Sequence, residues 1–362
     1  MSDNRNEAEE KMEKAIFICG NGWLAVFDLL APSQLGLGIA LISHRFDFYV
    51  DEHFSTRKWT LAFFRIRRKI GENGTNQMEI VNSHGKPLPT AQIRMPRAVI
   101  GLSARISFID QNAVAFLHRF RQLFATCQIY LTFSTADDRI LELIIHNIWP
   151  MLGRNIHGME LFAKGFHGLR QFVPSFLSDC PSLRFVFSGY FINLFPEFPA
   201  DYSAAASDGQ MLAKWLFTPL QNGVPKVFRC WINDEETFPS KIEALKSTFV
   251  NASSAANFII VIWFHWPSAD SAVLFDLTNE LTREQLALKM IDNNDTHPFL
   301  LMRCPIARDE SKWTKWEEEA IHCEIDELWN KIYIQIRDEF FSAGTGFSTH
   351  WTAQMMNSMN NG

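Results

Sequence analysis

Four short segments decide the expected fold of this chain: RISFID (105–110), QIYLTF (128–133), GMELFA (158–163) and SLRFVFSG (182–189). Each has the length and apolar content of a strand, and helix-like stretches lie between them. The four segments begin 23, 30 and 24 residues apart. Repetition at this period is typical of a β–α solenoid, in which each unit buries its apolar face against its neighbours. The sequence therefore predicts a mixed α/β protein with an irregular β–α repeat body.

The last third of the chain continues this alternation after a Phe/Pro-rich turn, NLFPEFPAD (193–201). The apolar runs KVFRCWI (226–232) and FIIVIWF (258–264) predict strands, and helices are expected around 209–216 and 242–250. The body is expected to end in short strands (273–277, 286–290, 299–304), a charged amphipathic helix (313–329) and a final strand (332–336).

Changes in composition divide the chain into five expected regions. A charged, disordered lead (1–15) precedes a compact helical unit (16–56). Short apolar stretches broken by Gly, Asn and Pro predict a strand/turn linker region (57–101). The β–α body covers 102–340, and the Gly-, Ser-, Asn- and Met-rich tail (341–362) is expected to fray.

Composition favours a folded protein with no membrane span. The chain has 362 residues, of which 47% are apolar, with 32 Phe and 11 Trp, and this is too apolar for a disordered protein. The net charge of −6 does not suggest a polyanionic partner. The longest apolar run, Phe258 to Trp266, is about half of the roughly 20 residues that a membrane helix needs.

The N-terminus and the cysteines predict a cytoplasmic or nuclear protein that is not secreted. No positively charged segment followed by an apolar core opens the chain, so no secretory signal is expected. The six cysteines are scattered without a C-x-x-C pair, and we expect free thiols in a reducing compartment.

The sequence contains no motif that predicts catalysis, a metal or a cofactor. It lacks a P-loop, an H-E-x-x-H pair and a G-x-S-x-G elbow. Cys304 and Arg308 faintly resemble a thiolate phosphate loop, but Pro305 removes a backbone donor and the Cys-to-Arg interval is too short. His265 is expected to be a core histidine rather than a metal ligand. We therefore expect a protein that is not an enzyme.

A basic cluster between Arg57 and Lys69 allows two interpretations. It holds six Lys and Arg residues, no acid and interleaved aromatic residues, a pattern that could follow a phosphate backbone. The alternation of Arg65, Arg67 and Lys69 equally fits a solvated strand face whose aromatic side chains turn inward. The second interpretation is favoured, so a nucleic acid is an unlikely partner.

Apolar spacing predicts three short helices in the N-terminal unit. Trp23, Phe27 and Leu30 recur on one face of a first helix, which ends at Pro32. A second helix is expected to begin at Ser33 and to carry a stripe formed by Leu35, Ile39, Ile42 and Phe46. A third turn through Tyr49, Val50 and Phe54 can close over the first two.

The run WLAVFDLLAPSQLGLGIALISHRFDFYVDEHF (23–54) resembles an F-box. Phe27, Leu29 and Leu30 match the first helix of that family, Pro32 matches its turn, and Leu35 opens its second helix. The ending of the family pattern is matched by Leu41, Ile42, Ser43, Arg45 and Phe46. The family's Leu-Pro-x-Glu opening is absent, and Trp23 and Leu24 stand near its place.

Later segments are similar to the F-box-associated region of the large nematode F-box class. They are ALISHRFDFYVDEHFSTRKW (40–59), FPEFP, GQMLAKWL and LTNELTREQLAL (277–288). In addition, FLSDCPSLRFVFSG (176–189) resembles one leucine-rich repeat of the F-box type. Together these resemblances imply a small three-helix F-box-like unit followed by a leucine-rich-repeat-like body.

The F-box resemblance implies a substrate-recognition adaptor of a cullin–RING ubiquitin ligase. Its partners would be a Skp-type linker, bound by the helical unit, and a target protein of unknown identity, held by the body. The expected linker contacts are Leu24, Phe27, Leu30, Pro32, Leu35, Ile39, Ile42 and Phe46. Two alternatives remain. The first is a non-catalytic scaffold without ligase association, in which these side chains are packed in the core of the chain itself. The second is a nucleic-acid-binding module that uses Arg57 to Lys69.

Overall fold

The computed structural model describes residues 18–30, 35, 39–56, 59–70, 76–82, 85–87, 99–119, 128–134, 138–173, 175–189, 193–203, 205–234, 236–264, 273–291, 298–322 and 330–335. The chain forms two compact units. The first comprises Met1–Ala62 and Leu88–Gly101, and the second comprises Phe63–Pro87 and Leu102–Gly362. The first unit carries the helices α1 (Gly20–Phe27) and α3 (His44–Thr56) and the 3-10 helix η1 (Ile39–Leu41).

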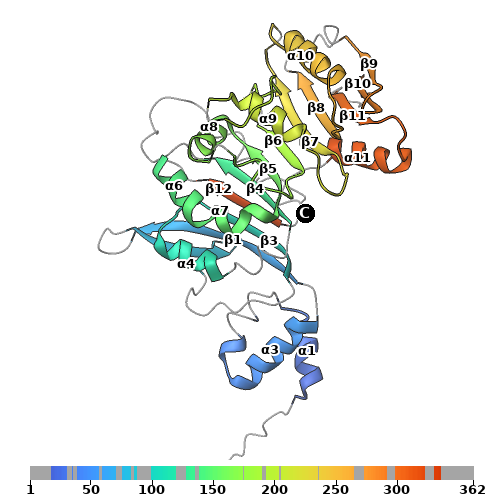
Figure 1. Ribbon diagram of the computed structural model, residues 1–362. Coiled ribbons are helices and arrows are strands. Elements are labelled where there is room, and N and C mark those ends of the chain that lie inside the picture. Colours follow the sequence, from blue (N-terminus) through green and yellow to red (C-terminus); the bar gives the residue numbers. More distant parts are fainter. Residues whose placement is uncertain are drawn as a thin grey trace, which may run out of the picture. The chain divides into compact units, whose positions relative to one another are not determined.

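The described strands form one mixed sheet in the order β2-β1-β3-β12-β4-β5-β6-β7-β8-β11-β10-β9 (Figure 1). In chain order they are β1 (Trp59–Ile70), β2 (Asn76–Asn82), β3 (Val99–Ile106), β4 (Ile129–Ser134), β5 (Ile156–Leu161), β6 (Phe185–Ser188), β7 (Lys226–Ile232), β8 (Phe258–Phe264), β9 (Phe275–Asn279), β10 (Glu284–Met290), β11 (Phe299–Pro305) and β12 (Asn330–Gln335). Neighbouring strands from β4 to β8 are parallel, and β12 is parallel to both β3 and β4. The strands β8, β11, β10 and β9 form an antiparallel end.

Helices alternate with the parallel strands along the chain (Figure 1). They are α4 (Gln111–Arg119), α6 (Asp138–Asn147), α7 (Trp149–Leu152), α8 (Ala163–Phe172), α9 (Asp208–Leu216), α10 (Phe238–Val250) and α11 (Glu310–His322). Parallel strands require such crossovers, because a tight turn cannot return the chain to the same end of the sheet.

Alternating side chains of the strands build a core on each face of the sheet. On β8, the ring of Phe258 meets Phe217, which follows α9, and the ring of Phe264 meets Phe238 of α10. On the opposite face, Ile259, Val261 and Trp263 of β8 pack in one buried cluster with Trp313 and Ala320 of α11. Because both faces are covered, β8 consists of consecutive apolar residues instead of alternating polar and apolar ones.

The mixed α/β class predicted from the sequence is confirmed, and two strands, β7 and β8, have the predicted limits. Strands were expected within 57–101, and β1 and β2 lie in this range and pair with each other at one edge of the sheet. The composition of the range did not predict this edge position, because strand pairing is non-local.

The strand order also departs from a simple solenoid. The chain returns from α11 to place β12 between β3 and β4, two strands that lie more than 190 residues before it in the chain. The helix α8 begins at Ala163, the last residue of the expected strand 158–163, and the helix-like stretch before that strand is divided into α6 and α7. In the part of the chain that the structure describes, we find no helix with the length and apolar character of a membrane span.

Candidate protein-interaction surface

The N-terminal helical unit closes a small core of its own. The buried side chains of this core are Phe27, Leu35, Ala40, Val50 and Phe54. Trp23 packs over the core, and its ring meets that of Phe46 edge-on, with centroids 4.8 Å apart. The described members of this cluster all come from residues 23–54, so these helices pack against one another.

His53 connects the end of α1 with α3 inside this unit. Its ring lies edge-on to Phe27, with centroids 5.7 Å apart, and its Nε2 is 3.7 Å from Oδ1 of Asp28. The His53 side chain is buried, so its ring is part of the packing between α1 and α3.

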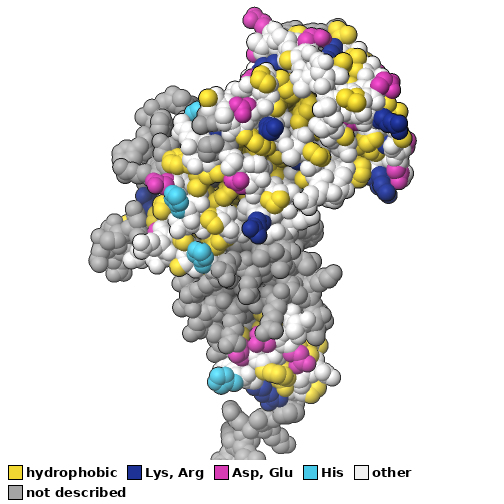
Figure 2. Space-filling model, viewed as in Figure 1, with side chains coloured by type: hydrophobic (Ala, Val, Ile, Leu, Met, Phe, Trp, Pro, Cys, Tyr) yellow, Lys and Arg dark blue, Asp and Glu magenta, His cyan; other side chains and the backbone are white. Residues whose placement is uncertain are grey.

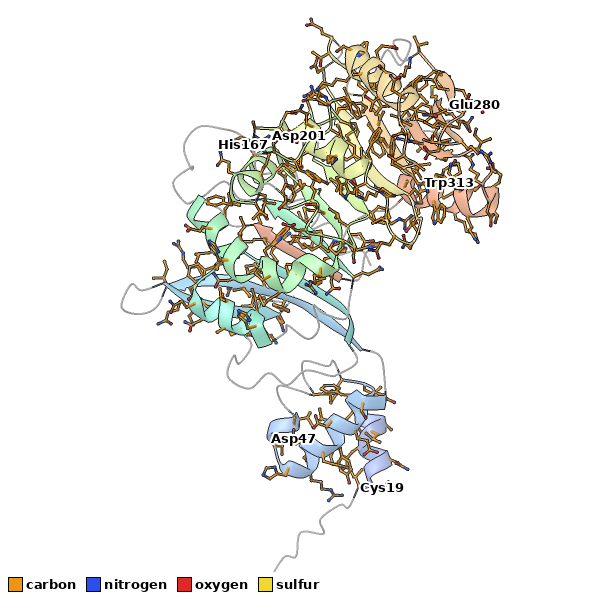
Figure 3. The ribbon with its side chains drawn as sticks, viewed as in Figure 1. Cys19, Asp47, His167, Asp201, Glu280 and Trp313 are labelled. Carbon is orange, nitrogen blue, oxygen red and sulfur yellow. The ribbon has the colours of Figure 1, made fainter. Side chains whose placement is uncertain are left out.

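Among the described residues of the unit, four large apolar side chains remain exposed: Val26, Leu29, Ile42 and Phe48. Val26 and Leu29 are three residues apart, which places them on one flank of α1 and its following turn. Phe48 is two residues from both Phe46 and Val50 on α3, so it points away from the side of the helix that carries the core. Figure 2 shows hydrophobic side chains on the surface of this unit beside acidic and basic ones, and Figure 3 labels Asp47 there.

The structure divides the predicted linker contacts into three groups. Phe27 and Leu35 are fully buried, so neither can touch a partner in this conformation, and for these two the sequence interpretation is wrong. Ile42 is 63% exposed and can bind directly. The partly buried group consists of Leu24, Leu30, Ile39 and Phe46. Pro32 lies outside the described residues.

The physical reason for this correction is the position of the second helix. The stripe Leu35, Ile39, Ile42 and Phe46 was predicted from continuous helical spacing, but η1 ends at Leu41 and α3 begins only at His44. Ile42 lies in this break and is exposed, whereas Leu35, which precedes η1, is buried. Val26, Leu29 and Phe48 were missed as candidate contacts, although helical spacing from Phe27 and Phe46 could have placed them off the core face.

The basic cluster has the geometry of a solvated strand face. Phe64 and Ile66 of β1 are buried, whereas Arg67 and Lys69 alternate with them. Arg67 Nη2 is 2.7 Å and Lys69 Nζ is 3.4 Å from the carboxylate of Glu79 on β2, and the hydrogen bond from Arg67 is the main cause that lowers the pKa of Glu79. These cations already have a protein counter-ion, and Arg57 and Lys58 lie outside the described residues.

Three of the described thiols, Cys180, Cys230 and Cys304, are buried, whereas Cys19 is exposed. Burial raises the pKa of Cys180 and Cys230. Burial also raises the pKa of Cys304, although the Arg308 guanidinium donates a hydrogen bond to its Sγ. Protonated, buried thiols are poor nucleophiles. No group of three or more His, Cys, Asp or Glu side chains that could hold a metal ion occurs among the described residues, and His265 lies outside them.

Comparison of the chain with protein-family models, with curated proteins and with solved structures found no match.

Proposed function

We propose that this protein is the substrate-recognition adaptor of a cullin–RING ubiquitin ligase and that its N-terminal helical unit binds a Skp-type linker. One observation carries the proposal: the described helices pack around a buried core and still expose large apolar side chains, Val26, Leu29, Ile42 and Phe48. Exposed apolar side chains on a small helical unit are typical of a partner-binding surface. The F-box resemblance of residues 23–54 supplies the class of partner.

The second unit would hold the target protein. Five successive parallel strands, β4 to β8, with one helical crossover after each of the first four, support the interpretation of this body as leucine-rich-repeat-like. The adaptor would act by proximity, because it would hold a target lysine near a ubiquitin carrier while other subunits supply the chemistry. No side chain of this chain needs to transfer a proton or attack a substrate.

The double substitution Leu29→Asp/Ile42→Asp is expected to reduce capture of the protein by an immobilised Skp-type linker at least tenfold. Each aspartate would place a carboxylate in an apolar interface without a partner, and a loss of about 1.4 kcal/mol already changes affinity tenfold. Both wild-type side chains are exposed, so the unit should keep its fold, which circular dichroism can verify.

Ile70→Asp provides a matched control for this experiment. Ile70 is 66% exposed, close to the 63% of Ile42, but it lies at the end of β1, away from the helical unit in sequence. The control should bind the linker as the wild type does. Equal capture of all three proteins, or no capture of the wild type, would show that these helices do not bind the linker.

The scaffold alternative makes a different prediction for a truncated chain. If the helical unit is independent, deletion of residues 1–56 should leave the melting temperature of the second unit unchanged, because the described members of the buried cluster of the helices all come from residues 23–54. Calorimetry measures this directly. Unfolding of the truncated chain would favour the scaffold, in which the helices are an integral part of one folded body.

A further inference from the structure

The strand β9 is the outermost strand at one edge of the sheet (Figure 1). It pairs with β10 from Phe275 opposite Leu288 to Asn279 opposite Glu284. In an antiparallel pair, every second residue directs its N–H and C=O away from the partner strand. Among the described residues, no backbone hydrogen bond occupies this outer side of β9. Figure 3 labels Glu280, which directly follows the strand at this edge.

The opposite edge of the sheet differs. There the chain turns after β2 and returns so that Val81 forms a bridge with Pro87. The turn is held by Asn82, whose side-chain oxygen accepts from the backbone N–H of Lys86. A proline beside an edge strand cannot donate to a further strand and so protects the edge from pairing. The described part of β9 has no such protection.

The two faces of β9 have different chemistry. Phe275 and Leu277 are half-buried on the side of α10, where the Lys246 ammonium lies 4.3 Å from the Phe275 ring centroid. Asp276 and Thr278 are exposed on the other side. A strand added to β9 would therefore have apolar residues beside Phe275 and Leu277 and polar residues beside Asp276 and Thr278.

Large exposed apolar side chains lie at both ends of this edge. Val273 and Leu274 directly precede β9, and Leu281 follows it. Val250, at the end of α10, is near the same turn, because Asn279 Nδ2 donates to its carbonyl oxygen at 3.3 Å. These side chains extend the apolar contact that an added strand could make.

The edge is held rigidly from behind. Asn279 Nδ2 donates to the carbonyls of Phe249 (2.7 Å) and Ala252 (3.0 Å), and its Oδ1 accepts from the N–H groups of Leu281 and Thr282. One buried side chain thus joins the end of α10 to the β9–β10 turn. A strand that is already ordered loses little conformational entropy when another strand pairs with it.

The charge of the edge selects between possible occupants. Residues 273–281 contain two acids, Asp276 and Glu280, and no Lys or Arg until Arg283. Pairing of two copies of β9 would bring four carboxylates to one interface, and like charges across a strand pair are destabilising. A strand with basic residues opposite Asp276 would be attracted instead.

We propose that β9 receives an extended segment of a partner protein, with alternating apolar and basic residues, which adds to the sheet as a further strand. Backbone hydrogen bonds would supply affinity, and the two faces of β9 would select the alternation. That this partner is the ubiquitination target rests on the proposed adaptor function, whereas the strand addition itself does not.

Hydrogen exchange of the free full-length protein gives the first test. The β9 amides that face β10 should exchange slowly, and the alternate amides between Phe275 and Asn279 should exchange rapidly. Slow exchange of all five amides would overturn the proposal, because the edge would already be paired. Concentration-dependent dimerisation with protection of β9 would overturn it in favour of pairing between two copies.

An end-capped eight-residue peptide of alternating valine and lysine is the probe for the second test. It should slow exchange of the outward-facing β9 amides at least tenfold at millimolar concentration, whereas a peptide with four valines followed by four lysines should not. Of two N-methylated versions, one modified on the valines and one on the lysines, only one should lose binding, because alternate amides of a strand face opposite edges. The proposal would be overturned if the alternating peptide gave no protection. It would also be overturned if both N-methylated peptides protected β9 as well as the unmodified peptide does.

Charge reversal on the protein completes the design. Asp276→Lys should weaken peptide binding at least tenfold, and Glu142→Lys, an exposed charge reversal on α6, should leave it unchanged. Equal binding by both variants would refute the charge selection. Because Leu29 and Ile42 are not used here, loss of linker capture and loss of peptide binding report separately on the proposed function and on this inference.

Discussion

Arg303→Met is expected to lower the free energy of unfolding of the second unit by about 3–5 kcal/mol, because it leaves a buried carboxylate without its partner. Arg303 is 0% and Glu284 1% exposed by side chain, and their closest N–O distance is 2.6 Å. Arg303 Nη2 also donates to the Ser254 carbonyl at 2.8 Å, and Glu284 Oε1 accepts from the Ala256 N–H at 2.8 Å. The pair therefore connects β10 and β11 to the loop before β8.

Aromatic rings exclude water from this pair. The Arg303 guanidinium carbon lies 4.9 Å from the Phe217 ring centroid and 5.2 Å from that of Phe249. A methionine can fill much of the same volume. The expected loss of unfolding free energy therefore comes mainly from the unpaired, buried charge of Glu284 rather than from a cavity.

Urea unfolding at neutral pH measures the effect, and two further variants show its origin. Arg303→Met/Glu284→Gln should recover a large part of the loss, because the amide keeps an acceptor for Ala256 and carries no charge. Lys312→Met, which breaks the exposed pair with Asp309, should change stability by no more than about 1 kcal/mol. If Arg303→Met costs no more than Lys312→Met, the buried pair does not stabilise the unit as argued.

The second large effect is a rise in stability with pH that depends on Lys226. This side chain is 4% exposed, its Nζ donates to the carbonyl oxygen of Trp215 at 2.7 Å, and it lies 5.0 Å from the Trp215 ring centroid. Burial lowers the pKa of Lys226 from its usual 10.5 to about 7. The lysine contacts the last turn of α9, where a cation is favourable, but burial dominates.

The sign follows from the proton balance. Between pH 7 and 10.5 the unfolded chain keeps Lys226 protonated while the folded protein releases the proton, so unfolding binds a proton and stability rises with pH. Below pH 7 the cost of the buried charge is fully present, and above pH 10.5 it is absent. At about 1.4 kcal/mol per pH unit, the rise from pH 7 to pH 8.5 is about 2 kcal/mol.

The measurement compares the free energy of unfolding at pH 6 and pH 8.5 for the wild type, Lys226→Met and Lys214→Met. Lys226→Met should remove the rise of about 2 kcal/mol, whereas Lys214→Met, which replaces an exposed lysine of α9, should retain it. The range ends at pH 8.5 because the cysteines contribute an opposite slope at higher pH, where their thiols ionise in the unfolded chain. Equal pH profiles for wild type and Lys226→Met would contradict the assignment.

Elements bounded by clear local signals were predictable from the sequence. The strand β8 is an uninterrupted apolar run and β7 is a mainly apolar one, and both were located to the residue. The helix α9 was found within one residue, because Ser207 caps it and Asp208 and Lys214 lie at the favourable ends of its dipole. Such signals depend only on residues that are neighbours in the chain, so the local amino-acid sequence is enough to predict these elements.

The candidate surface was only partly predictable. Helical spacing placed the apolar residues of the N-terminal unit on short helices, but only the structure shows that Leu35 is buried and that Ile42, in the break between η1 and α3, is exposed. A shift of one or two residues in a helix boundary rotates a side chain by 100–200°, and this is enough to exchange core and surface.

Local patterns of apolar, polar and turn-forming residues specified the α/β class, most of the strands and the absence of catalytic motifs. They did not specify that β12 lies between β3 and β4, that β1 and β2 form one edge and β9 the other, or that Arg303 meets Glu284 in the core. These features depend on pairing between residues that are distant in the chain. The free energy of this pairing comes from shared burial and from backbone hydrogen bonds, and it produces no periodic pattern within any one segment.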